Sequence, residues 1–186
     1  MDDKKYLPFK IIHLILMFII AVITFIDLIK MTRQLGSTID LNLLIDMAFG
    51  IVNIMAMDVG ILYLVSGYKK NSAMYYKLFF GLLSVALVIR IVLFLMNKAN
   101  TLLLVCSIVS LILSLVLFLK KDLGRNYSLI LFITLFLIEI VIKFPFMAND
   151  ASIRRMGNEL SMFMLFGTAG FMISAKYIDK ELRGTK

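Results

Sequence analysis

Residues 41–67 read LNLLIDMAFGIVNIMAMDVGILYLVSG, and this stretch decides the fold. As an α-helix it would be about 40 Å long at 1.5 Å per residue, which exceeds a hydrocarbon core of about 30 Å. The stretch therefore predicts a transmembrane helix that tilts, bends or protrudes. It also carries Asp46, Asn53 and Asp58. Because ionisable groups are costly at membrane depth, they usually face a partner or a wet cavity.

The composition of the whole chain agrees with a membrane protein. Of its 186 residues 61% are hydrophobic, whereas a soluble domain has about 45–50% apolar residues. The formal net charge is +8, which could indicate a nucleic-acid partner. The lysines and arginines lie almost entirely between the apolar runs, however, so they are better explained by membrane topology. We therefore expect the lipid bilayer, and no nucleic acid, as a partner.

Apolar runs separated by polar loops recur along the chain. They predict transmembrane spans at about residues 9–29, 41–67, 73–96, 101–119, 127–146 and 160–175. The first run is too long for a signal-peptide core and no small-residue cleavage site follows it, so we interpret it as an uncleaved span. The expected fold is all-α: a single integral membrane domain over residues 1–186, built as a bundle of six transmembrane helices.

The distribution of basic residues predicts the orientation. Six spans place both termini on one side, together with the lysine pairs at residues 4–5, 69–70 and 120–121 and the basic tail at residues 176–186. Cytoplasmic loops carry an excess of lysine and arginine. The sequence thus predicts a multi-pass protein of the cell membrane with both termini in the cytoplasm.

This topology places several charged residues at similar depths in the outer half of the membrane. They are Asp27, Asp46, Arg90, Glu139 and Lys143. At 100° per residue Asp46 and Asn53 lie on one stripe of their helix. Glu139 and Lys143 are spaced i, i+4 and could pair locally, which leaves Asp46 as the preferred partner of Arg90. Asp58 lies on another face of the helix, and neither it nor His13 receives a role.

Two functional hypotheses follow. In the first, the chain is a small-solute binding or transport component, and Asp27, Asp46, Asn53, Arg90, Glu139 and Lys143 line a polar pocket in the outer half. A set of interhelical pairs that only locks the bundle would produce the same pattern. In the second, the chain is an accessory or scaffold subunit of a larger membrane complex. Small-residue faces allow helices to approach closely, and the candidate docking faces are Ser107, Ser110 and Ser114, or Gly167 and Gly170.

Enzyme function is not favoured. The sequence contains no G-x-S-x-G elbow, no H-E-x-x-H motif and no glycine-rich phosphate loop. Its single histidine and single cysteine cannot form a Cys/His metal site. We therefore predict no catalytic residues, no metal and no cofactor.

Overall fold

The computed structural model describes residues 7–34, 41–66, 72–98, 101–119, 125–147, 162, 165–169 and 172. Five helices account for most of these residues: α1 (Leu7–Gln34), α2 (Leu41–Ser66), α3 (Ser72–Met96), α4 (Thr101–Leu119) and α5 (Arg125–Met147). The described part of the chain is all-helical and contains no strand. The predicted all-α class is therefore confirmed.

Three of these helices are long and apolar enough to cross a membrane. The qualifying segments are Leu41–Tyr63 in α2, Met74–Met96 in α3 and Thr101–Leu119 in α4. Within α5 the apolar segment Ile130–Ile142 is shorter. A membrane protein is thus supported, whereas the six-span count and the side on which the termini lie stay predictions.

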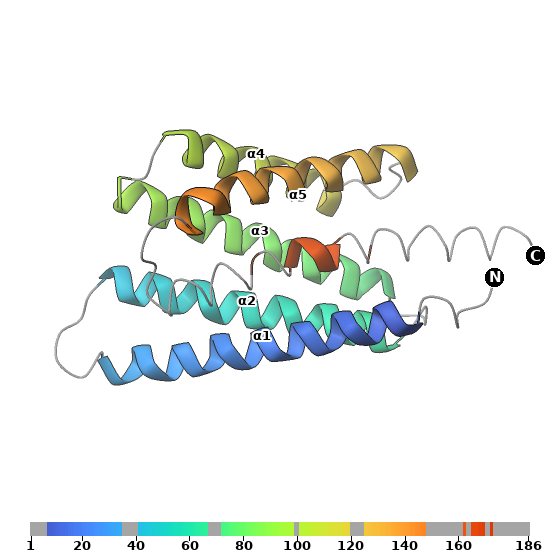
Figure 1. Cartoon of the computed structure of the whole chain (residues 1–186). Coiled ribbons are helices and arrows are strands. Elements are labelled where there is room, and N and C mark those ends of the chain that lie inside the picture. The colour runs from blue at the N-terminus through green and yellow to red at the C-terminus, as the bar shows by residue number, and fades with distance from the viewer. Residues whose placement is uncertain are drawn as a thin grey trace, which may run out of the picture.

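Consecutive helices pack side by side and run in alternating directions (Figure 1). α2 and α3 form the most extensive contact, followed by α3 with α4, α1 with α2, and α4 with α5. Each helix is thus packed against its neighbours in sequence, as short connections favour. α3 is central, and Phe79, Phe80, Leu83 and Leu87 on this helix are fully buried.

A short helical segment from the last predicted span enters the main core. It comprises residues 165–169, and Figure 1 shows it in red between α3 and the α1–α2 pair. The Thr168 hydroxyl donates to the Met17 sulfur of α1 at 3.2 Å, and the Tyr63 hydroxyl of α2 donates to the Met172 carbonyl at 3.4 Å. Residues far apart in sequence therefore close the core around α2.

Gly60 allows this close approach. A Cβ atom at this position would lie 2.8 Å from Thr168 Cγ2 and 3.2 Å from Met17 Cε. Real Cβ contacts essentially never fall below 3.0 Å, so any larger residue would force the side chains of Thr168 and Met17 to shift. At Gly81 on α3 the nearest atom, Phe118 Cε2, would be 3.5 Å away, which is ordinary contact.

The connection between α3 and α4 begins with a defined C-cap. The Asn97 side-chain amide donates to the Leu93 carbonyl at 2.8 Å, and the Lys98 backbone amide donates to the Leu95 carbonyl at 3.3 Å. Lys98 has a φ of 49°, the left-handed conformation that often follows a helix end. α3 therefore ends in a turn at residues 97–98.

Candidate functional site

The strongest polar feature inside the bundle is an ion pair between α3 and α5. Arg90 Nη1 donates to Glu139 Oε2 at 2.8 Å. The side chains of Arg90 and Glu139 are 3% and 0% exposed, respectively. α3 and α5 do not otherwise pack closely along their backbones, so the long arginine side chain connects two helices that are not direct neighbours.

This pairing corrects one expectation from the sequence. Asp46 was the expected partner of Arg90, but the partner is Glu139. Helical phase shows which face of a helix carries a residue, but it does not show which helix packs there. The side chain of Lys143, the expected partner of Glu139, lies outside the described residues.

The ion pair leaves part of its hydrogen-bonding capacity unused within the described part of the chain. Arg90 Nε and Nη2 are buried without a hydrogen-bond partner there, and so is Glu139 Oε1. Nε and Nη2 form one edge of the planar guanidinium, which is the geometry that binds a carboxylate through two parallel hydrogen bonds. The ion pair therefore offers, in a buried environment, two adjacent N–H donors of Arg90 and one acceptor oxygen of Glu139.

A small apolar cluster lies about one helical turn beyond the ion pair along α3 and α5. Phe94 of α3, Leu103 of α4 and Ile142 of α5 form a separate small core cluster, against which Cys106 and Ile138 pack. Phe94 follows Arg90 by one helical turn, and Ile142 follows Glu139 by three residues. Because this environment has a low effective dielectric, both the attraction within the pair and the cost of unused polar atoms are larger than in water.

Serine side chains of α4 face the same region. Ser107, Ser110 and Ser114 are all fully buried, and the hydroxyls of Ser84 on α3 and Ser114 are 3.0 Å apart. From this contact Arg90 lies about 9 Å further along α3, and Ser110 lies about 6 Å in the same direction along the antiparallel α4, at 1.5 Å per residue. Ser110 Oγ is also buried without a hydrogen-bond partner among the described residues.

The serine face thus contributes to helix packing within the chain. Its three residues were a candidate docking face for another protein, but all three are buried within the chain, and Ser114 contacts Ser84 of α3. This confirms that small hydroxyl residues mediate helix packing here and corrects the idea that they dock a partner. Of the alternative face, Gly167 is half-buried, and Gly170 lies outside the described residues.

The remaining predicted site residues are distributed over other positions. On α2, Asn53 is fully buried, Asp46 is half-buried and Asp58 is exposed. The side chains of Asp27 and His13 on α1 lie outside the described residues. Among the described residues, the structure therefore places Arg90 and Glu139 together and leaves the larger six-residue site as a prediction.

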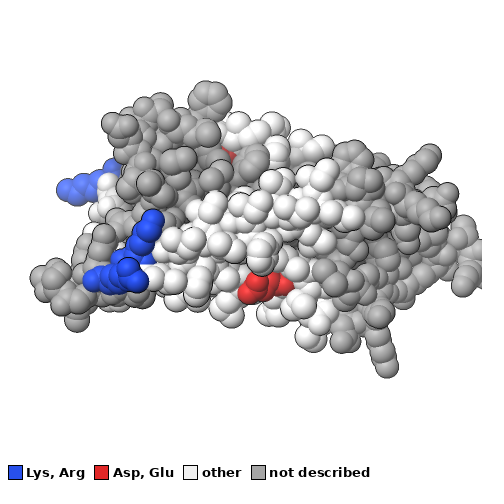
Figure 2. Space-filling model, turned by 60° about the horizontal axis from the view of Figure 1, so that its bottom comes forward, with Lys and Arg blue, Asp and Glu red and all other residues white. Residues whose placement is uncertain are grey.

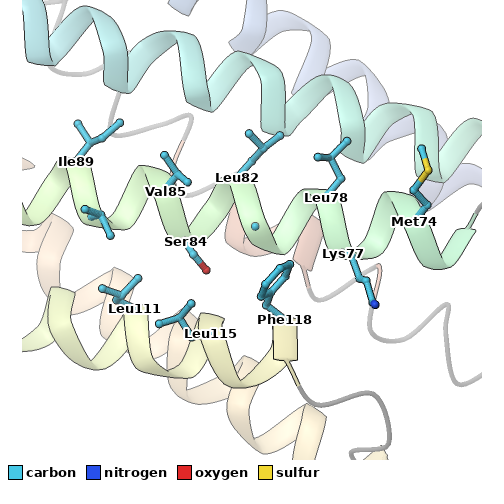
Figure 3. Close-up of a pocket in the computed structure, with 12 residues that line it drawn as sticks. Met74, Lys77, Leu78, Leu82, Ser84, Val85, Ile89, Leu111, Leu115 and Phe118 are labelled. Carbon is cyan, nitrogen blue, oxygen red and sulfur yellow. The ribbon is translucent and has the colours of Figure 1, made fainter.

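A separate groove of about 800 Å³ lies between α3 and α4. Its lining is almost wholly apolar and includes Leu78, Val85 and Leu115. Lys77 lies at the Met74 end of this groove (Figure 3). The groove is a surface feature distinct from the buried ion pair, because neither Arg90 nor Glu139 lines it.

Comparisons with protein-family models, curated proteins and solved structures gave no match.

Proposed function

We propose that the chain is a membrane component that binds or carries a small polar solute at the Arg90–Glu139 pair. The unused edge of the Arg90 guanidinium carries this proposal. A buried arginine is expensive in a membrane unless all of its donors are satisfied. Here Glu139 satisfies one donor, whereas Nε and Nη2 have no partner among the described residues and could donate to a ligand group.

The chemistry of the site favours a solute with a carboxylate group. The two donors of the guanidinium edge match the two oxygens of a carboxylate. Glu139 Oε1 could then accept a hydrogen bond from an amine or hydroxyl group on the same solute, and the Ser110 hydroxyl could donate or accept one. Because Arg90 and Glu139 neutralise each other, a zwitterionic amino acid would enter without adding net charge to the interior.

Residues of α2 complete the proposed site. Asn53 is fully buried on the same helical stripe as Asp46, and this stripe is the one predicted to face the other polar groups. In this proposal Arg90 binds the carboxylate and Glu139 holds Arg90 in place. Asp46, Asn53, Asp27 and Lys143 would surround the entry from the outer half of the membrane.

The test uses the purified full chain in mild detergent and measures its thermal unfolding in the presence of glycine, acetate or glycine methyl ester. We expect glycine and acetate to raise the unfolding temperature, because both offer a carboxylate, and the methyl ester to have no effect. The variant with both Arg90→Leu and Glu139→Leu should remain folded, because a buried ion pair can be replaced by apolar groups at little cost.

The double variant separates binding from packing. We expect it to lose the response to glycine and acetate, whereas Arg33→Leu, which changes an exposed arginine at the end of α1, should keep the response. A folded double variant that still responds to the carboxylates would refute the site. Absence of any response in the wild-type chain would refute the carboxylate specificity.

A further inference from the structure

α2 presents a regular outward-facing stripe that is apolar except at one position. Its members are spaced alternately three and four residues apart, which is the repeat of a helix that packs against another helix at a shallow crossing angle. The exposed residues of this ridge are Leu41, Leu44, Ala48, Ile51, Met55, Asp58 and Leu62. A helix face that contacted only lipid would not be expected to carry an aspartate.

Asp58 lies inside the apolar part of α2. Eight residues separate it from Ser66 at the end of the helix, which is about 12 Å at 1.5 Å per residue. The side chain is exposed and forms no ion pair with any described residue. A short carboxylate at this depth cannot reach the interface as a lysine can, and the described residues of the same chain give it no basic partner, so a base of a second copy can take that place.

The groove between α3 and α4 carries a base at a similar depth. Lys77 is exposed and lies five residues after Ser72, where α3 begins, which corresponds to about 8 Å. Ser66 and Ser72 are the facing ends of two consecutive antiparallel helices, so these depths are measured from the same side. The remaining difference of about 4 Å is within the reach of the four-carbon lysine stem.

The other exposed bases lie elsewhere. Among the described side chains these are Lys30, Arg33 and Lys98, which belong to the opposite ends of α1 and α3. Figure 2 shows basic side chains gathered at one end of this face, with an acidic side chain further along it. Lys77 is therefore the exposed base, within the described residues, whose depth matches Asp58.

We propose that the chain self-associates, with the α2 ridge of one copy seated in the α3–α4 groove of a second copy and Asp58 paired with Lys77 of that copy. The groove of about 800 Å³ supplies the apolar surface for Met55 and Leu62, and the charge pair fixes the register. The contact is antiparallel, like the α2–α3 contact within one chain. It involves neither Arg90 nor Glu139, so it is independent of the proposed solute site.

Cysteine crosslinking in native membranes tests this contact. Two differently tagged copies are co-expressed in a Cys106→Ala background, one with Leu62→Cys on the ridge and the other with Leu78→Cys in the groove, because these two positions lie at similar depths. We expect a disulfide-linked dimer that carries both tags. As a matched control, Ile130→Cys on the exposed face of α5 replaces Leu78→Cys and should give at least tenfold less of that dimer.

Charge exchange then tests the pairing itself. Asp58→Lys in the Leu62→Cys copy, or Lys77→Asp in the Leu78→Cys copy, should each reduce the crosslinked fraction at least fivefold. Both changes together should restore it to within about twofold of the starting value, which loss of folding could not do. The proposal would be overturned if either charge reversal left the crosslinked fraction unchanged, or if the exchanged pair failed to restore it. A strictly monomeric protein whose groove holds lipid would overturn it as well.

Discussion

Removing one member of the Arg90–Glu139 pair should destabilise the bundle far more than removing both. The charges are buried, so solvent screens them little. At a charge separation of about 4 Å and an effective dielectric constant of about 20, their attraction is about 4 kcal/mol. Arg90→Leu or Glu139→Leu alone leaves an uncompensated buried charge and should lower the free energy of unfolding by about 3–5 kcal/mol.

The double variant should behave differently. With both charges replaced by leucine, no desolvated ion remains, and the cost should fall to within about 2 kcal/mol of zero in either direction. The coupling between the two positions is then several kcal/mol, whereas independent positions add to within about 0.5 kcal/mol. Reversible unfolding of the full chain in mixed micelles of mild and denaturing detergent measures all four forms.

The control for this cycle is Arg33→Leu, since Arg33 is exposed at the end of α1. It should change the free energy of unfolding by no more than about 0.5 kcal/mol. The reasoning would be refuted by additive costs of Arg90→Leu and Glu139→Leu, because additivity would mean that the two side chains do not meet in the folded protein. In that case the double variant would lose as much stability as the two single variants combined.

Three further changes test the packing of the helices, each by the same unfolding measurement. Gly60→Ala should cost about 1–3 kcal/mol because its new methyl group overpacks the core, whereas Gly81→Ala should be neutral or stabilise by up to about 1 kcal/mol through helix propensity; equal effects would contradict the close approach at Gly60. Lys98→Gly should stabilise the chain by about 1 kcal/mol, because glycine adopts a positive φ without strain, and a loss of stability would contradict the left-handed turn. Ser84→Ala and Ser114→Ala should each cost about 0.5–1.5 kcal/mol, with less than additive loss in the double variant; full additivity would mean that the two hydroxyls are not bonded.

The helices themselves were largely predictable. Expected spans at residues 41–67, 73–96 and 101–119 agree within one residue at either end with α2, α3 and α4, because each apolar run is bounded by polar or helix-breaking residues. α1 continues to Gln34, whereas the predicted span ends at residue 29. Hydropathy marks where a helix leaves the lipid, and backbone hydrogen bonding continues into the polar residues beyond it.

The partners inside the bundle were less predictable. The sequence indicated that Arg90 needs a buried acid, but local i, i+4 spacing made Lys143 appear to satisfy Glu139. The helices that come within reach of each other are determined by how they pack around α4. The residue pattern of a single helix does not contain this information. Asp58, by contrast, was separated from Asp46 by helical phase alone, and its exposed position on α2 agrees with that separation.

The most direct test of the proposed site is the environment of the Arg90 guanidinium itself. Protein labelled with ¹⁵N-arginine is compared with the Arg90→Lys variant to assign the Arg90 Nε and Nη signals by nuclear magnetic resonance. We predict that glycine or acetate shifts the Nε and Nη2 signals, while the Nη1 signal, from the atom bonded to Glu139, moves less. An Arg90 spectrum that is unchanged at saturating concentrations of both carboxylates would contradict the account and leave the pair as a structural lock.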